Sequence, residues 1–170
     1  MVEAEHEAVT THGEGAGEEE DWNPFILGIF CNWCSYAGAD GAGTSRMQRP
    51  ASLRIVRVMC SGRVEPEYVL RGLKNGADGV LVSTCHAGDC HYVAGNYKTF
   101  RKAPLIKTFL KQMGVNPARF RLTNVSASEG AELTEIVNEF VEELHKIGPS
   151  PFKKAKGKEH LIPEKVDEDI

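Results

Sequence analysis

The alternation of apolar and polar stretches along this chain predicts a small α/β domain. Three short apolar runs, at about residues 25–31, 53–59 and 79–84, have the length and composition of buried strands. A fourth, shorter run covers about residues 120–125. The segments between these runs repeat apolar residues at helical spacing, so strands and helices alternate. This alternation predicts right-handed crossovers and a parallel sheet of about four strands, covered by helices.

Start and stop signals bound three of the expected helices. One is expected to begin near Glu65–Pro66, because proline suits the first helical turn, and to end at Asn75–Gly76. The clearest helix follows a capping box at Ser126–Glu129 and stops at Gly148–Pro149. A short helix is expected near Tyr36–Arg46, in a segment rich in glycine and alanine.

A further helix is expected over residues 90–113, ending at Gly114. Pro104 lies inside this stretch and is expected to break or restart the helix, because proline lacks the backbone N–H that a helix interior needs. The first half of the expected inner face consists of Tyr92, Val93, Tyr97 and Phe100.

Both ends of the chain differ in composition from the middle. Residues 1–22 are rich in Glu and Gly and almost free of large apolar side chains, so we expect an acidic arm that is disordered, or ordered only on a partner. Residues 149–170 are rich in Lys, Glu and Pro and are expected to form an extended tail. The predicted folded domain is therefore residues 23–148.

Composition and charge limit the cellular compartments and the classes of partner that are expected for this protein. No apolar run approaches the roughly 20 residues that cross a membrane, and the N-terminus lacks the pattern of a signal peptide. The net charge is −4, and no basic patch is interleaved with aromatic residues, which makes nucleic acid a poor partner. We therefore expect a cytoplasmic protein that engages neither membranes nor nucleic acid.

Five cysteines are placed where a parallel sheet would bring them together. Cys31, Cys60 and Cys85 follow or end three predicted strands, and Cys34 and Cys90 lie in the loops just after. The carboxyl ends of the strands in an open parallel sheet line the crevice where ligands bind. Thiolates select iron–sulfur clusters, zinc or copper(I), or serve as redox groups. The sequence thus predicts a soft metal site or a redox site at this edge.

The spacing of the cysteines favours a metal over a catalytic dithiol. Cys31 and Cys34 form a C-x-x-C pair, which holds a metal or forms a reversible disulfide, whereas a lone buried cysteine is simply a small hydrophobe. A dithiol enzyme needs two sulfurs, while tetrahedral zinc or a cluster needs four. The odd number of cysteines also argues against a closed set of disulfides.

Iron is favoured over zinc because the ligands are spread over separate strands. Structural zinc sites use two tight pairs of ligands, and here only Cys31 and Cys34 are tightly paired. A 2Fe-2S cluster suits ligands that lie further apart, although the spacing matches neither standard ferredoxin pattern. His86 and His91 each follow a cysteine. They are interpreted as solvent-facing groups or as neighbours of the ligands, rather than as the ligands of a Rieske centre.

Longer motifs around these cysteines carry a resemblance to a known family. The chain closely resembles the delta, or iron–sulfur, subunit of methyl-viologen-reducing hydrogenase from methanogenic archaea, over about residues 24–147. The segments that carry the resemblance are Phe30–Asp40, Arg57–Val64, Gly76–Val82, Cys85–Tyr92 and Gly95–Tyr97.

The resemblance implies a cofactor and partners. Members of this family are electron-transfer subunits that carry one 2Fe-2S cluster and are not catalysts themselves. They link a nickel–iron hydrogenase or a formate dehydrogenase to the A-type subunit of heterodisulfide reductase, within a large hetero-oligomer of methanogenesis. The flavin of that A-type subunit bifurcates electrons. The family's cysteine positions map onto Cys31, Cys34, Cys60, Cys85 and Cys90, so four of these five are implied as cluster ligands.

Sequence and resemblance together lead to one main interpretation and two alternatives. The main one is a small flavodoxin-like, three-layer domain that relays single electrons, with Trp33, Tyr36, Tyr92 and Tyr97 as candidate contact residues. The spare fifth thiol is hypothesised to swap into the cluster as a redox-linked gate. The alternatives are a thiol–disulfide oxidoreductase that uses the C-x-x-C pair, and a structural zinc scaffold.

Overall fold

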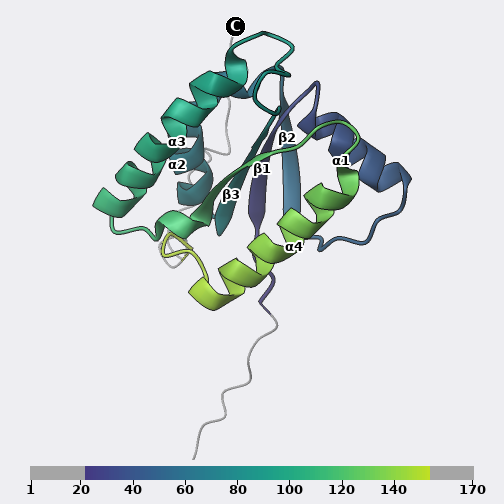
Figure 1. Cartoon of the computed structure of the whole chain (residues 1–170). Helices are drawn as coiled ribbons and strands as arrows, with labels where there is room; N and C mark the ends of the chain where they lie inside the picture. Colours follow the sequence, from purple (N-terminus) through teal and green to yellow (C-terminus); the bar gives the residue numbers. More distant parts are fainter. Residues whose placement is uncertain (1–21, 154–170) are drawn as a thin grey trace, which may run out of the picture.

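The computed structural model describes residues 22–153, which form three layers of helices, sheet and helices (Figure 1). The predicted acidic arm and most of the predicted C-terminal tail lie outside the described residues, and the predicted domain boundaries stay predictions. In chain order the strands and α-helices are β1 (Ile26–Cys31), α1 (Ser35–Thr44), β2 (Leu53–Val58), α2 (Pro66–Lys74), β3 (Gly79–Thr84), α3 (Gly95–Gln112), β4 (Phe120–Asn124) and α4 (Gly130–Ile147).

The sheet is parallel throughout and has the strand order β2-β1-β3-β4. This order matches the first four strands of the flavodoxin-like arrangement and confirms the predicted fold class. The four strands lie within about two residues of the predicted runs, because each run is short, apolar and bounded by turn residues. β1 is central, with Ile26 opposite Leu53 of β2 and Gly79 of β3.

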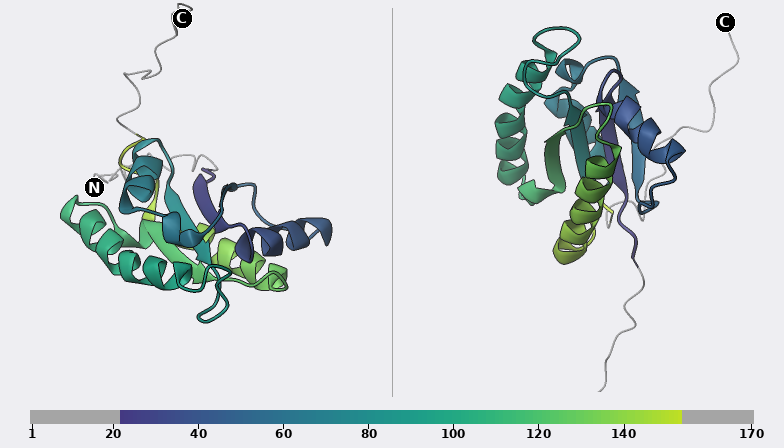
Figure 2. Two further views of the ribbon diagram at one scale, coloured as in Figure 1. Left: turned by 90° about the horizontal axis from the view of Figure 1, so that it is seen from above. Right: turned by 45° about the vertical axis from the view of Figure 1, so that its right-hand side comes forward.

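Helices α2 and α3 cover one face of the sheet (Figure 2). The core on this face combines alternate residues of the central strands with the apolar sides of the two helices. Its buried members include Ile29, Val80 and Val82 from strands, Val69 and Leu73 from α2, and Ile106 and Leu110 from α3. α2 starts at a proline and is followed by Gly76 with a φ of 104°, as its sequence predicts.

Helices α1 and α4 cover the opposite face of the sheet. The neighbouring residues of the same strands point this way, so Ile26, Phe30 and Leu81 are buried against α4. α4 repeats apolar residues at helical spacing, and those that face the sheet are buried: Leu133, Val137, Phe140, Val141 and Leu144. α4 ends at Gly148, whose φ of 80° is readily adopted only by glycine.

The prediction for α3 is wrong in two respects. The helix begins at Gly95 rather than near residue 90, and it continues through Pro104 without a break. Ala103, Ile106 and Leu110 are buried on both sides of the proline, so packing of one continuous face outweighs the lost hydrogen bond. The predicted inner residues Tyr92 and Val93 lie before the helix and are 47% and 80% exposed. Further along, Tyr97 is also mostly on the surface, at 44%.

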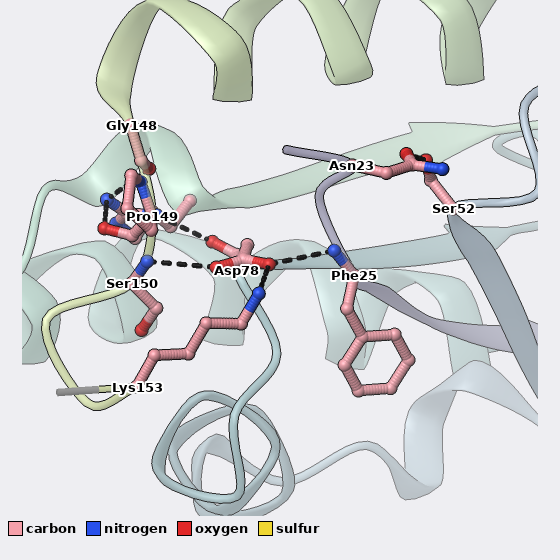
Figure 3. Close-up of polar contacts among 9 residues, drawn as sticks. Asn23, Phe25, Ser52, Asp78, Gly148, Pro149, Ser150 and Lys153 are labelled. Atoms are coloured by element: carbon pink, nitrogen blue, oxygen red, sulfur yellow. Dashed lines mark hydrogen bonds and ion pairs between the residues drawn. The ribbon is translucent and has the colours of Figure 1, made fainter. Parts of the chain in front are cut away.

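A buried carboxylate fastens the two ends of the described chain at the amino-terminal edge of the sheet (Figure 3). Asp78, just before β3, is fully buried and accepts hydrogen bonds from the backbone N–H groups of Phe25 and Ser150, at 2.8 and 2.9 Å. The ammonium group of Lys153 pairs with the same carboxylate. The buried Arg119 donates to the backbone carbonyls of Asp78, Gly148 and Pro149. This clasp holds both ends of the described chain away from the carboxyl edge of the sheet.

Within residues 22–153, no helix has the length and apolar character that crossing a membrane requires.

Candidate functional site

The carboxyl ends of β1 and β3 bring two buried thiols together. Cys31 is the last residue of β1, and Cys85 follows the last residue of β3. Their Sγ atoms lie 3.6 Å apart, and both residues are 1% exposed. β1 and β3 are neighbours whose crossovers run on opposite faces of the sheet, which is the switch point where open α/β sheets bind ligands. The structure therefore places these two predicted site residues at the expected crevice.

The other three cysteines surround this pair. Cys34 precedes α1, is only partly buried, and its thiol and that of Cys85 each influence the pKa of the other. Cys60 lies in the loop after β2, and its sulfur and that of Cys90 both lie beside the Cα of Gly95. All five thiols are free and face one another at one edge of the sheet. The predicted convergence of the cysteines is thus observed.

Two glycines allow the backbone to approach the thiols of Cys60 and Cys90. A Cβ built on Gly95 would lie 2.1 Å from Sγ of Cys60 and 3.2 Å from Sγ of Cys90. A Cβ on Gly62 would lie 2.9 Å from the carbonyl oxygen of Gly95. Any side chain at Gly95 would displace a thiol, so this glycine is a requirement of the site rather than of a turn.

The start of α3 directs backbone N–H groups at the thiol of Cys90. Burial alone would raise the pKa of Cys90, but the backbone N–H groups of Asn96, Tyr92 and Gly95 donate to its sulfur, and the thiol of Cys60 assists them. Together these donors lower the pKa of Cys90 below its ordinary value. Cys90 is therefore the thiol in this group best prepared to be a thiolate.

The remaining thiols with perturbed acidity behave in the opposite way. Burial raises the pKa of Cys34, Cys60 and Cys85 above the ordinary value. Negative charge on neighbouring sulfurs adds to the rise, because each additional charge at this edge disfavours the next, although the interaction with Cys85 partly offsets it for Cys34. A cation placed among the thiols would remove that penalty, which is the electrostatic condition for binding metal.

Buried polar contacts fix the loops that carry the thiols. The side chain of Asn96 is fully buried and donates to the carbonyl oxygen of His86, at 2.6 Å. The ammonium group of Lys102 donates to the carbonyls of Gly62 and Val64, both at 3.2 Å. Both Asn96 and Lys102 belong to α3, so this helix holds the loop after β3 and the loop after β2 in one arrangement.

His86 faces a carboxylate rather than the thiols. Its Nε2 atom lies 2.7 Å from Oε2 of Glu129, which also accepts from the backbone N–H of Ser126. The hydrogen bond to Glu129 raises the pKa of His86, and the same bond lowers the pKa of Glu129. The contact of the Glu129 carboxylate with the backbone N–H of Ser126 is the one that the predicted capping box requires, but Ser126 is not the N-cap: Glu129 holds that position and α4 starts at Gly130. His86 is therefore held beside the site without contacting a sulfur through this nitrogen.

A group of exposed aromatic rings borders the thiols. The rings of Trp33 and His91 are stacked, with centroids 3.8 Å apart, and the indole N–H of Trp33 donates to the hydroxyl of Tyr92 at 3.2 Å. These contacts join the loop of Cys34 to the loop of Cys90. The next residue, Val93, has a φ of 66°, which is unusual for a β-branched side chain. We call the three rings of Trp33, His91 and Tyr92, together with the adjoining Val93, the aromatic rim.

The donors at this edge fit a group bound through sulfur. Thiols come from three strand ends, and Gly95 leaves room beside two of them. The buried hydroxyl of Ser35, next to Cys34, has no hydrogen-bond partner among the described residues, as expected where a bound group completes a site. Across residues 22–153, no three His, Cys, Asp or Glu side chains are arranged to hold a single metal ion.

Several contributors to the site were not identified from the sequence. Asn96 belongs to a segment that carries the family resemblance, but neither its contact with the loop of Cys90 nor that of Lys102 with the loop of Cys60 has a sign in the local sequence pattern. The pairing of His86 with Glu129 spans 43 residues. Tyr36, a candidate contact residue, is partly buried against the core and lies under the guanidinium of Arg57.

Comparison with known proteins identifies relatives whose alignments span all four strands of the sheet. A family model described as the methyl-viologen-reducing hydrogenase delta subunit matches residues 26–148. The chain is 48% identical over 135 residues to the D-type iron-sulfur subunit of the F420-non-reducing hydrogenase of Archaeoglobus profundus. This alignment covers 79% of the chain and 98% of that protein. The chain is also 47% identical over 139 residues to the corresponding vhc iron-sulfur subunit of Methanococcus voltae, covering 82% and 96% of the two chains.

A relative of a different kind is much longer. The chain is 44% identical over 155 residues to the A-type subunit of the Ferredoxin/F(420)H(2)-dependent CoB-CoM heterodisulfide reductase of Methanosarcina acetivorans. The alignment covers 90% of this chain but 20% of that protein. A domain of this kind thus occurs both as a small separate chain and as part of a larger one.

Proposed function

Because this chain belongs to the family of the methyl-viologen-reducing hydrogenase delta subunit, we propose that it is an electron-transfer subunit carrying a 2Fe-2S cluster. It relays electrons from a hydrogenase, or from a formate dehydrogenase, to the bifurcating flavin of the A-type heterodisulfide reductase subunit in methanogenesis. The single observation that carries this proposal is the convergence of five thiols at the switch point between β1 and β3.

The cluster ligands are drawn from Cys31, Cys34, Cys60, Cys85 and Cys90. A 2Fe-2S cluster takes four of these thiolates and, when bound, supplies a one-electron carrier. The backbone N–H groups aimed at Cys90 stabilise negative charge on sulfur, which favours the reduced state. Burial of Cys31 and Cys85 keeps water from that side of the site.

The partners follow from the two kinds of relative. One kind is named as a hydrogenase iron-sulfur subunit, and the other as the A-type subunit of a heterodisulfide reductase. A domain that is fused to the A-type subunit in one organism is expected to lie against that subunit when it is a separate chain. We therefore propose a hetero-oligomer in which this chain lies between an electron-donating hydrogenase and the reductase.

The aromatic rim supports a role in contact with a partner. Trp33 and Tyr92 are 42% and 47% exposed, and both adjoin loops that carry cysteines. Aromatic side chains of this kind are typical anchors of interfaces. Contact at the rim would bring a partner's redox group close to the cluster, and this chain needs no catalytic residue for that task.

The site gives less support to the two alternatives. A thiol–disulfide oxidoreductase would pair Cys31 with Cys34, but the close sulfur–sulfur contact of Cys31 is with Cys85. A structural zinc scaffold would need four ligands around one ion, whereas among residues 22–153 not even three His, Cys, Asp or Glu side chains surround a single ion position.

Reconstitution with the partners tests the proposed relay. The cluster-loaded full chain is mixed anaerobically with hydrogen, the hydrogenase and the heterodisulfide reductase of its own organism, and reduction of the flavin is followed by absorbance. We expect fast reduction only with the cluster-loaded chain. Equal rates with chain stripped of iron by a chelator, or with no chain, would contradict the relay.

A further inference from the structure

We propose that the five thiols divide into two ligand pairs and one free thiol. Cys31 and Cys85 hold one iron, Cys60 and Cys90 hold the other, and Cys34 stays uncoordinated beside Cys85. This assignment rests on the proposed function, because it presupposes a 2Fe-2S cluster. It adds the identity of the spare cysteine, which neither the motif spacing nor the number of thiols provides.

The first pair has the separation that one metal ion imposes. Two thiolates on a tetrahedral metal with bonds of about 2.3 Å lie about 3.8 Å apart. The Sγ atoms of Cys31 and Cys85 are 3.6 Å apart. Both side chains are 1% exposed and belong to the ends of adjacent strands, so this separation is set by the sheet.

The second pair is defined by its surroundings. The thiols of Cys60 and Cys90 flank the Cα of Gly95, where a Cβ would lie 2.1 and 3.2 Å from the two sulfurs, so both sulfurs lie at one point of the backbone. They are 9% and 8% exposed. Contacts from α3 reach both of their loops, so this pair is as firmly placed as the first.

Cys34 is the thiol left over by these two pairs. The sulfur contact of Cys85 at 3.6 Å is with Cys31, and the structure gives Cys34 no sulfur contact of that kind among residues 22–153. Each iron of a 2Fe-2S cluster is bound by two protein thiolates, so the iron bound by Cys85 takes only one further cysteine. Cys31 fills that position from a strand, whereas Cys34 stands in a turn, is only partly buried and makes no capping bond to α1.

The free thiol of Cys34 lies between the aromatic rim and the buried pair of cysteines. It follows Trp33, whose ring is stacked on His91 in the loop of Cys90. A partner that contacts the aromatic rim therefore reaches the loop of Cys34 before it reaches the buried pair. A free thiol next to a coordinated Cys85 is also placed to substitute for Cys31, which is the arrangement that ligand exchange requires.

Chemical labelling identifies the free thiol without altering the chain. The cluster-loaded full chain is treated anaerobically with iodoacetamide, and the labelled peptides are identified by mass spectrometry. We expect one label, on Cys34, with iron, sulfide and the visible spectrum unchanged. The same protein stripped of its cluster and unfolded in urea is the control and should be labelled at all five cysteines, including the buried Cys31 and Cys85.

Single variants supply an independent readout. Cys34→Ala should keep two irons, two sulfides and the EPR signal, while Cys31→Ala, Cys60→Ala, Cys85→Ala and Cys90→Ala should each lose iron. Labelling at another cysteine or at none, or loss of iron from the Cys34→Ala variant, would overturn the assignment while leaving the cluster in place in the native chain. A native chain without iron would instead overturn the proposed function, so the two failures are distinguishable.

Discussion

The Cα of Gly95 lies so close to Cys60 that a Cβ on this glycine would be 2.1 Å from its Sγ atom. Gly95 is also the first residue of α3, and Thr99 donates its hydroxyl to the Gly95 carbonyl at 3.2 Å. The helix cannot move away without disturbing that turn. The chemistry of this edge therefore depends on a residue that has no side chain.

Replacing this glycine should empty the site and leave the fold in place. In Gly95→Ala, the new methyl group displaces the thiol of Cys60, and we expect iron content to fall severalfold while the circular dichroism spectrum stays native. Gly43→Ala is the matched control, because a Cβ at this position of α1 would meet nothing within 4 Å. Within a helix, alanine is more stabilising than glycine by about 0.5–1 kcal/mol, so this control should not lose stability. Full iron content in Gly95→Ala would disprove the close-approach argument.

Removing the indole of Trp33 should weaken partner binding and spare the cluster. Trp33→Ala loses the stack on His91 and the hydrogen bond to Tyr92, and an aromatic anchor of an interface is worth about 2 kcal/mol or more. We expect affinity for the A-type reductase subunit or for the hydrogenase to fall about thirtyfold or more, measured by biolayer interferometry with the cluster-loaded chain. Tyr68→Ala, at a residue of α2 that is 43% exposed, is the control. Equal affinities for the two variants would remove the aromatic rim from the interface.

The clasp around Asp78 should contribute to stability and have no effect on the cluster. Asp78→Asn keeps the shape of the side chain but loses the charge that pairs with Lys153. It also replaces one of the two oxygens that accept from the backbone N–H groups of Phe25 and Ser150 by an NH2 donor. Since Lys153 is partly exposed, we expect a loss of about 2–3 kcal/mol in urea unfolding. Iron content should be unchanged, because the clasp is at the opposite end of the sheet. Asp40→Asn, at an exposed position, is the control, and an equally small loss in both variants would contradict the role of the clasp.

The pair of His86 and Glu129 predicts a pH window for stability. The raised pKa of His86 stabilises the fold below the ordinary value of 6.5, and this contribution is lost as pH rises through the raised value. The lowered pKa of Glu129 stabilises the fold above 4.5, and this contribution is lost as pH falls through the lowered value. The pair therefore contributes most between pH 4.5 and 6.5.

Urea midpoints measured across this pH range test the pair. Glu129→Gln should lower the midpoint most within the window, and the pKa of His86 should fall in NMR titration, although Glu132 and Asp89 still raise it. Glu135→Gln, at an exposed position of α4, is the control. A uniform decrease at every pH would mean that the charge of the pair has no part in stability.

Strands, helical faces and the convergence of the cysteines could be predicted because each depends on local pattern. Short apolar runs defined the strands. Because the carboxyl ends of parallel strands meet at the same edge of the sheet, cysteines at those ends, such as Cys31 and Cys85, had to lie together. The stop of α4 at Gly148 could likewise be predicted from the residue type, because its positive φ favours glycine.

The start of α3 could not be predicted because it depends on distant groups. Tyr92 and Val93 fit a helical stripe, yet the loop that contains them must direct N–H groups at the sulfur of Cys90. Val93 in the same loop has a φ of 66°, which a β-branched residue rarely adopts and which its own residue type does not predict. The contacts of Asn96 and Lys102 escaped prediction for the same reason, since their partners belong to other loops.

Metal analysis combined with EPR tests the central claim most directly. The full chain is purified anaerobically, its iron, acid-labile sulfide and zinc are measured, and EPR spectra are recorded before and after reduction with dithionite. We predict two irons and two sulfides per chain, no zinc, and a rhombic signal that appears only on reduction. Zinc alone, or a metal-free chain with a titratable dithiol, would contradict the electron-transfer account.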